Sequence, residues 1–345
     1  MRAVILSGPD QFAPGEIPIP VPKSGEILVQ MQAAAICGTD IRILEGKKTK
    51  GVRYPSVIGH EICGVVSQVG EQVEGIAVGD RVAIANVIPC GNCSSCLGGR
   101  ENACLARQAI GYEFDGGFAE YVLIPEIAIK RGNIIKLPDD ISFAEGALIE
   151  PLACCLRGMR NAGVGFGHVV LIVGAGPIGL MHMQLAKAAG ASLVMVSEPI
   201  ESRRQKAAQL GADVIVNPLE EDLDAIVKEH TNGLGADVVV LAIGVPAVVN
   251  SCLKLCRRGG TVNLFAGFTG TGESTIEANL IHYNEINVNG STAYMRQDYH
   301  EAARMVAAHK INLAEIVTHT YKIEEFQSAY EVCKSSEGLK VIIQP

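Results

Sequence analysis

The feature that most constrains the fold is a glycine-rich turn that follows a short apolar run. Val169–Val173 is typical of a buried strand and leads directly into Gly174–Gly179, whose sequence is GAGPIG. Glycines at this spacing permit a sharp turn and close approach of the backbone to a phosphate, and the next helix directs its N-terminus at a dinucleotide pyrophosphate. The same glycine pattern also occurs in ordinary tight turns, so the sequence around it has to show whether it is part of a dinucleotide-binding domain.

From Gly167 onward, strand and helix patterns alternate at the intervals of βαβ units. Helices are expected over Glu201–Leu210 and Ala247–Arg257, each ended by a glycine, at Gly211 and Gly259. This alternation predicts an α/β domain with a mostly parallel, doubly wound Rossmann sheet. The expected strands are Val169–Val173, Leu193–Ser197, Val214–Val216, Val238–Ala242, Thr261–Phe265 and Ile286–Asn289.

An acidic residue about 20 positions after such a turn binds the ribose hydroxyls of NAD. Glu198 meets this expectation, because it lies nineteen residues after Gly179, just past the second strand. Its carboxylate would repel the 2′-phosphate of NADP, so NAD is favoured. Arg203 and Arg204 are a signal in the opposite direction, since either could pair with that phosphate. An exposed helix face is the alternative interpretation of both arginines.

The first 140 residues alternate short apolar runs with turn residues, which indicates a β-rich, barrel-like domain. A buried helix is expected to begin at Phe143. After Tyr294, a helix over His300–Lys310 and two strands, Ile316–Tyr321 and Leu339–Ile343, are expected to return to this domain. The strands expected in the first part are Glu26–Ala35, His60–Val69, Arg81–Ala85 and Phe118–Ile124.

Four cysteines within fifteen residues have the spacing C-x2-C-x2-C-x7-C. Thiolates this close can surround one metal ion, and zinc favours four sulfur ligands in a closed structural site. Buried thiols, disulfides or an iron–sulfur cluster are the alternatives, although ferredoxin spacing ends with three intervening residues and a proline. We therefore predict structural zinc. Its ligands are Cys90, Cys93, Cys96 and Cys104.

A second set of metal ligands is spread along the chain. Cys37 and the pair His60–Glu61 supply a thiolate, an imidazole and a carboxylate, and Glu150 supplies a second carboxylate. Three protein ligands with an open fourth position are typical of catalytic zinc. Both glutamates border apolar runs, where an unpaired carboxylate would be costly unless a metal or its water relieves it. Taken separately, these residues are more often structural.

Composition limits the alternatives. A chain of 345 residues is long enough for two domains, and the net charge of −8 argues against nucleic-acid binding. No run approaches the length of a membrane span, and the N-terminus lacks a signal-peptide pattern. The odd count of eleven cysteines favours reduced thiols and metal over disulfides. We expect a cytoplasmic protein.

In these motifs the chain resembles the zinc-dependent medium-chain dehydrogenases/reductases, in particular their sorbitol and threonine dehydrogenase branch. The resemblance covers nearly the whole chain, with the motifs in the family's order. It implies a GroES-like catalytic domain over residues 1–152 and 295–345, a Rossmann NAD-binding domain over 153–294, and an active site in the cleft. The motifs are Cys37–Asp40, Gly59–Glu61, the four-cysteine lobe, Gly79–Val82, Glu150–Leu152 and Gly174–Gly179.

The resemblance also implies roles for individual residues. Catalytic zinc would be held by Cys37, His60 and one or both of Glu61 and Glu150, and Asp40 would hydrogen-bond the histidine. The zinc would lower the pKa of a substrate hydroxyl, and hydride would pass to the nicotinamide. The residues with catalytic roles would be Thr39, as proton relay, Glu61 and Glu150. The residues contacting the cofactor would be Gly174, Gly176, Pro177, Ile178, Gly179, Glu198 and Arg203.

Two departures from the family pattern leave the substrate open. Arg42 stands where many relatives have a relay histidine, and it either shifts proton release to Glu150 and water or binds an anionic substrate group. Ala293–Tyr294 replaces an Arg-Tyr pair of polyol enzymes. We predict a zinc-dependent NAD(H) oxidoreductase acting on a polyol, sugar alcohol or its phosphate, as a homodimer or homotetramer. L-threonine 3-dehydrogenase and a non-catalytic zinc- and NAD-binding redox sensor are the alternatives.

Overall fold

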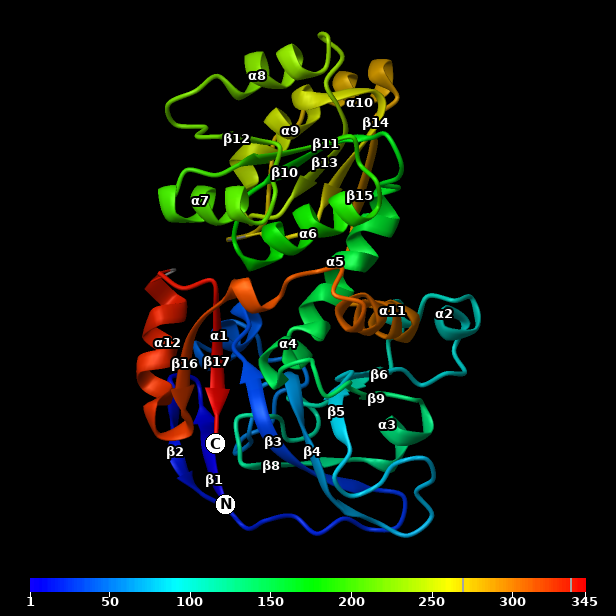
Figure 1. The fold of residues 1–345 in the computed structure, drawn as a ribbon, viewed down its shortest axis with the longest axis vertical. Coiled ribbons are helices and arrows are strands. Elements are labelled where there is room, and N and C mark those ends of the chain that lie inside the picture. Colours follow the sequence, from blue (N-terminus) through cyan, green and yellow to red (C-terminus); the bar gives the residue numbers. More distant parts are fainter. Residues whose placement is uncertain (269, 336) are drawn as a thin grey trace. The chain divides into compact units, whose positions relative to one another are not determined.

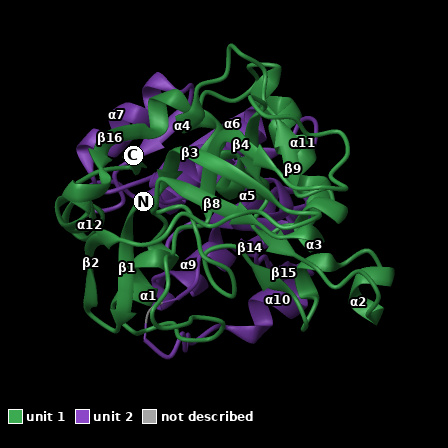
Figure 2. Ribbon diagram, turned by 90° about the horizontal axis from the view of Figure 1, so that it is seen from below, with its two compact units in different colours: residues 1–153, 294–345 green, residues 154–293 purple. Residues whose placement is uncertain are grey.

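The computed structural model describes residues 1–268, 270–335 and 337–345 and contains two compact units. The first unit comprises Met1–Ala153 and Tyr294–Pro345, and the second comprises Cys154–Ala293 (Figure 2). Within the described residues, every helix is too short or too polar to cross a membrane.

The first unit is β-rich (Figure 1). Its strands are β1 (Arg2–Gly8), β2 (Gln11–Glu16), β3 (Ile27–Ala35), β4 (Glu61–Val69), β5 (Arg81–Ile84), β6 (Val87–Ile88), β7 (Gln108–Ala109), β8 (Tyr121–Ile124), β9 (Ile134–Lys136), β16 (Val317–Lys322) and β17 (Lys340–Gln344). Its α-helices are α1 (Gly38–Leu44), α2 (Ser94–Leu97), α3 (Glu126–Lys130), α4 (Phe143–Ala147), α11 (Arg296–Ala307) and α12 (Phe326–Ser335), and α5 (Ile149–Ala162) begins at its end.

A seven-stranded sheet with the order β16-β17-β3-β4-β5-β9 organises this unit, and β8 also pairs with β3. β3 is almost entirely buried because its sequence, ILVQMQAAA, is largely apolar. Gly64 of β4 lets the two strands approach, since a Cβ there would lie 2.2 Å from the carbonyl oxygen of Gln30. The expected tail strands do return to this unit, where β17 pairs with β3.

The register of this sheet brings three distant segments to one end. Ala35, the last residue of β3, pairs with Glu61, the first residue of β4, and with Ile342 of β17. The N–H of Ile36 then donates to the carbonyl oxygen of Val341 at 2.9 Å. The segments that follow β3, precede β4 and open β17 therefore meet.

The second unit contains a six-stranded parallel sheet with the order β12-β11-β10-β13-β14-β15, and helices cover both of its faces (Figure 1). This confirms the predicted doubly wound sheet. Its strands are β10 (Val169–Val173), β11 (Leu193–Ser197), β12 (Val214–Val216), β13 (Ala236–Leu241), β14 (Cys256–Leu264) and β15 (Asn287–Gly290). Its α-helices are α6 (Pro177–Ala188), α7 (Glu201–Gln209), α8 (Leu223–His230), α9 (Val249–Leu255) and α10 (Ala278–Asn284).

Two helix boundaries differ from the sequence prediction. The helix expected over Ala247–Arg257 ends at Leu255, because Cys256 already pairs with Ala236 as the first residue of β14. The helix expected from His300 begins at Arg296. Here the carboxylate of Asp298 accepts the N–H of Met295 at 2.9 Å and so stabilises the first turn.

The core of the second unit contains an unusual buried histidine. His182 of α6 is 0% exposed, and its ring packs edge-on against Phe265 with the ring centroids 4.4 Å apart. Neither ring nitrogen has a hydrogen-bond partner among the described residues. Burial therefore lowers the pKa of His182 to about 3. The ring is neutral in the folded protein and must lose its packing or accept a costly charge in acid.

We predict that His182 makes the second unit sensitive to acid. The pKa of its ring is lowered on folding, so the unfolded chain binds the proton first and stability falls as the pH drops from about 6.5 towards 3. The slope from this group approaches about 1.4 kcal/mol per pH unit. In urea unfolding, the free energy of unfolding of His182→Met should rise relative to that of the wild type as the pH falls. The exposed His230 provides the control, because His230→Met should keep the wild-type slope. A difference in free energy of unfolding between His182→Met and the wild type that is the same at every pH would contradict the prediction.

Candidate functional site

Helix α1 positions the first metal ligand. Cys37 is its N-cap, and its sulfur accepts the N–H of Thr39 at 3.4 Å. Asp40, in the first turn, accepts the backbone N–H of Cys37 at 2.9 Å with Oδ2. The first turn thus fixes the thiol beside the end of β3. Thr39 is partly buried.

The second ligand, His60, lies immediately before β4 and is 4% exposed. Its Nδ1 is 2.9 Å from Oδ1 of Asp40, which is 0% exposed. Burial disfavours the protonated imidazole, but the Asp40 carboxylate prevails and holds the pKa of His60 well above its ordinary value. With Nδ1 facing Asp40, Nε2 is the nitrogen left for a metal.

Glu61 completes a cluster of three ligand residues. One ligand atom each from Cys37, His60 and Glu61 lies within 4.8 Å of the other two. Glu61 is 0% exposed, and both of its carboxylate oxygens are 2.5 Å from Nζ of Lys340, at the start of β17. The lysine is also buried, and despite the opposing effect of burial the Glu61 charge keeps its pKa above the ordinary value.

The other predicted carboxylate, Glu150, lies outside this cluster. It is buried near the start of α5, and burial raises its pKa to about 7, partly offset by the charge of His60. Lys340, which no sequence motif indicated, is the counter-charge of Glu61, a role that the sequence predicts for a metal or its bound water. The only sequence signal was one charged residue opening an apolar strand, Val341–Ile343.

The donor set fits zinc. A thiolate from one segment and an adjacent imidazole and carboxylate from another leave one coordination position for water or substrate. The ring of Tyr112 lies beside this cluster, with its centroid 5.4 Å from that of His60. Its hydroxyl is 3.5 Å from Nδ1 of His60. Sequence reasoning missed Tyr112 because a single tyrosine in a loop has no pattern.

The four predicted lobe cysteines also meet. Their sulfur atoms lie within 4.8 Å of one another, at 3.5 Å for Cys93 and Cys96, 3.5 Å for Cys90 and Cys104, and 3.9 Å for Cys90 and Cys96. Sulfur atoms in a tetrahedral zinc–thiolate site with bonds of about 2.3 Å are about 3.8 Å apart. The distances exclude disulfides, whose sulfur atoms are about 2.05 Å apart. The N–H groups of Asn92 and Cys93 lower the pKa of Cys90 to about 6, which favours the thiolate.

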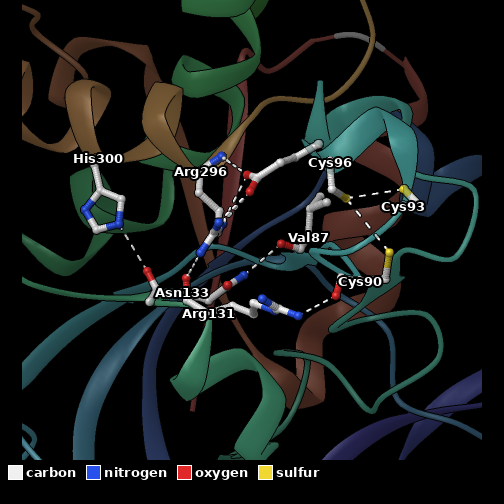
Figure 3. A network of polar contacts seen from close by, with 10 residues as sticks. Val87, Cys90, Cys93, Cys96, Arg131, Asn133, Arg296 and His300 are labelled. Carbon is white, nitrogen blue, oxygen red and sulfur yellow. Dashed lines mark hydrogen bonds and ion pairs between the residues drawn. The ribbon is translucent and has the colours of Figure 1, made fainter. Parts of the chain in front are cut away.

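A polar network attaches this lobe to the body of the first unit (Figure 3). Arg296, at the start of α11, pairs with Glu101 in the lobe and lowers the pKa of its carboxyl. Arg131 donates to the carbonyl oxygen of Cys90, and Arg296 donates to that of Arg131. Nδ2 of Asn133 donates to the carbonyl oxygen of Val87 at 2.7 Å. The lobe is therefore held by side chains from two other segments.

The glycine-rich turn has the geometry that its sequence predicts. Gly174 follows β10 with a φ of 101°, and a Cβ on Gly179 would lie 1.8 Å from the carbonyl oxygen of Gly174. A Cβ on Gly176 would have a single neighbour within 4 Å, Nη1 of Arg203 at 3.9 Å. Pro177 and Ile178 then begin α6. The open backbone at Gly176, beside a guanidinium and at a helix N-terminus, fits a pyrophosphate.

Glu198 has a second role that the sequence did not reveal. It is 2% exposed, and its two carboxylate oxygens accept the N–H groups of Ala175 at 2.7 Å and Ile200 at 3.0 Å. The carboxylate thereby fixes the glycine-rich turn and still has lone pairs for further donors. Arg204 donates to the carbonyl oxygens of Glu198 and Pro199 and pairs with Glu201. Of the two arginines, Arg203 is the one beside the turn.

Comparison with known proteins agrees with this geometry. Residues 23–139 match the model of the alcohol dehydrogenase GroES-like domain, and residues 177–308 match that of the zinc-binding dehydrogenases. The chain is 36% identical to the L-threonine 3-dehydrogenase of Pyrococcus furiosus, over 99% of this chain and 98% of that protein. It is 33% identical to the sorbitol dehydrogenase of Halalkalibacterium halodurans, over 100% and 99%.

Among solved structures, a protein of Sinorhizobium meliloti 1021, assigned as a zinc-binding dehydrogenase and bound to NADP, has a TM-score of 0.92. It is 34% identical, and the match covers 100% of this chain and 99% of the other. Likeness of this extent, in sequence and in fold, shows that the chain belongs to the zinc-dependent medium-chain dehydrogenase family.

Proposed function

We propose that this protein is a zinc-dependent NAD(H) oxidoreductase that interconverts a secondary alcohol, of the polyol, sugar alcohol or sugar alcohol phosphate class, and the corresponding ketone. The observation that carries the proposal is the meeting of Cys37, His60 and Glu61 in one buried cluster. L-threonine 3-dehydrogenase is the second candidate, because a relative of that name is 36% identical to the chain.

When bound, zinc would polarise the substrate hydroxyl and the nicotinamide would accept hydride. The chain's own residues prepare the site for this chemistry. Asp40 fixes the ring of His60 and the turn of Cys37 through its two oxygens. Thr39 is the proposed proton relay, since its hydroxyl lies in the first turn of α1 beside Cys37. It would take up the alcohol proton while its own proton passes on towards the cofactor ribose.

Of the two glutamates predicted as ligands, Glu61 is the one whose carboxylate belongs to the cluster with Cys37 and His60, so we place it before Glu150 in the proposed ligand set. Lys340 holds both oxygens of Glu61, and ligation would require the carboxylate to exchange the ammonium for the metal. For the coenzyme we propose NAD. The Glu198 carboxylate, just after β11, would repel the 2′-phosphate of NADP, and Arg204 bonds to the carbonyl oxygen of Glu198 and to Glu201. Arg203, whose guanidinium lies beside Gly176, is the cation proposed to lie near the phosphates.

We also propose that the protein forms a homodimer or homotetramer through β15. This strand ends the sheet of the second unit, so one of its sides presents backbone groups that the sheet does not pair. Such an edge is available for pairing with a second copy.

We predict that Cys37→Ser abolishes turnover and leaves NAD binding intact, because the metal ligand and the glycine-rich turn belong to different units. Loss of the metal's electrostatic contribution should lower kcat by about a thousandfold or more. NADH formation should be followed with polyols, sugar phosphates and L-threonine. Cys333→Ser, in α12 and outside both clusters, is the control. Full turnover by the metal-free protein would refute the zinc mechanism, and NAD binding without any turnover would indicate a sensor.

We predict that Lys340→Met destabilises the zinc-free protein by about 3–5 kcal/mol, because it leaves the Glu61 carboxylate buried without a counter-charge. The double variant Glu61→Gln/Lys340→Met should recover most of this free energy of unfolding. Lys322→Met, at an exposed position of the neighbouring β16, is the matched control. If Lys340→Met is as stable as Lys322→Met, the ion pair of Glu61 and Lys340 contributes nothing to the free energy of unfolding.

We predict that the protein binds two zinc ions per chain, one for each cluster of ligands. Cys96→Ser should remove one of them and open the lobe to proteases, since the short helix α2 has no buried residue to stabilise it. Zinc content and the rate of cleavage within residues 90–104 would be measured together. An unchanged zinc content in Cys96→Ser would rule out the four-thiolate site.

A further inference from the structure

A lysine beside the candidate metal site, Lys48, forms no ion pair with any residue that the structure describes. The backbone N–H of Lys48, in the loop after α1, donates to the carbonyl oxygen of Arg42 at 3.0 Å. Its ammonium lies over the ring of Tyr112, 4.0 Å from the centroid, and donates to the carbonyl oxygen of Lys50 at 3.2 Å. The same Tyr112 ring packs against His60. One aromatic ring therefore separates this cation from a proposed zinc ligand.

The nearby carboxylates are engaged elsewhere. Burial lowers the pKa of Lys48, the charges of Glu113 and Asp40 raise it, and those of Arg107 and Arg42 lower it. Glu113 accepts the N–H of Ala109 at 2.8 Å, and Asp40 bonds to Cys37 and His60.

Two further cations, Arg42 and Arg107, are close enough to Lys48 for their charges to act on it. In the described part of the chain, Lys48, Arg42 and Arg107 form no ion pair, and the guanidinium of Arg107 donates to the carbonyl oxygen of Asn102 at 2.6 Å. Lys47, the neighbour of Lys48, shows the ordinary arrangement for a surface lysine, because it pairs with Glu45 at 2.7 Å. Lys48 is half-buried, whereas Arg42 and Arg107 are exposed. The two guanidinium charges repel its ammonium, and an anion bound beside Lys48 would relieve that repulsion.

We propose that Lys48, supported by Arg42 and Arg107, selects an alcohol substrate that carries an anionic group, either a carboxylate or a phosphate. The inference rests on the proposed dehydrogenase function and narrows its substrate class. The residues of the metal site would hold the hydroxyl to be oxidised, and the ammonium over Tyr112 would bind the charge at the other end of the molecule. Tyr112 sets the distance between them and shields the ammonium from water on one side, which strengthens its interaction with an anion.

The test compares substrates that share a polyol chain and differ in whether one end carries an anionic group. Sorbitol, sorbitol 6-phosphate and gluconate would be assayed with the zinc-loaded protein and NAD, so that the two anionic arms distinguish phosphate from carboxylate. We expect kcat/KM for one anionic substrate to exceed that for sorbitol by about tenfold or more, as a charge-assisted contact provides. Lys48→Gln should remove this advantage and leave sorbitol unchanged, and Lys48→Arg should keep it. Lys47→Gln is the control.

A second readout does not depend on turnover. Calorimetric titration of the zinc-loaded protein with inorganic phosphate and with acetate should detect binding that weakens about tenfold in Lys48→Gln and with rising salt. Equal turnover of neutral and anionic substrates, or equal losses for both in Lys48→Gln, would overturn this inference and leave the dehydrogenase function standing. Absence of turnover with every substrate, L-threonine included, would overturn both.

Discussion

The candidate metal centre depends on a single buried carboxylate. Asp40 accepts the backbone N–H that orients Cys37 and bonds to the ring that orients His60, at 2.9 Å in each case. These two ligands come from opposite sides of a long loop between β3 and β4, and no backbone hydrogen bond would by itself fix their side chains together. Because Asp40 is 0% exposed, water cannot replace either partner. The geometry of the ligands is therefore set before a metal arrives.

The same buried region has to balance several charges. Asp40 faces His60, and Glu61 faces Lys340, so each carboxylate has a group that can carry a positive charge. Glu150 responds to the charges of all these groups, and burial keeps its pKa near 7. A divalent ion entering this cluster adds two charges and displaces a proton or an ammonium, so metal binding and the ionisation of these side chains are coupled.

Local sequence patterns predicted most of the strands and helices and the residues of both ligand clusters, but not the side chains that surround the candidate metal site. The strand over Val169–Val173 and the glycine-rich turn were predicted to the residue because backbone chemistry there depends on adjacent positions. The lobe cysteines also meet as their spacing requires. Lys340 and Tyr112 were not predictable, since they reach the site through the register of β17 with β3 and through a loop. The helix ending at Leu255 was placed too far along because pairing with β13 overrides helix propensity.

The two clusters differ in what they require of the chain. The lobe ligands lie within fifteen residues, so zinc can organise that segment before distant contacts form, and the pairs of Arg296 and Arg131 then attach it to the unit. The other cluster exists only after Ala35 has paired with both Glu61 and Ile342, which joins the beginning and the end of the chain. We therefore expect the proposed reactive centre to need the long-range pairing of the first unit, whereas the lobe ligands need only a short loop closed around zinc.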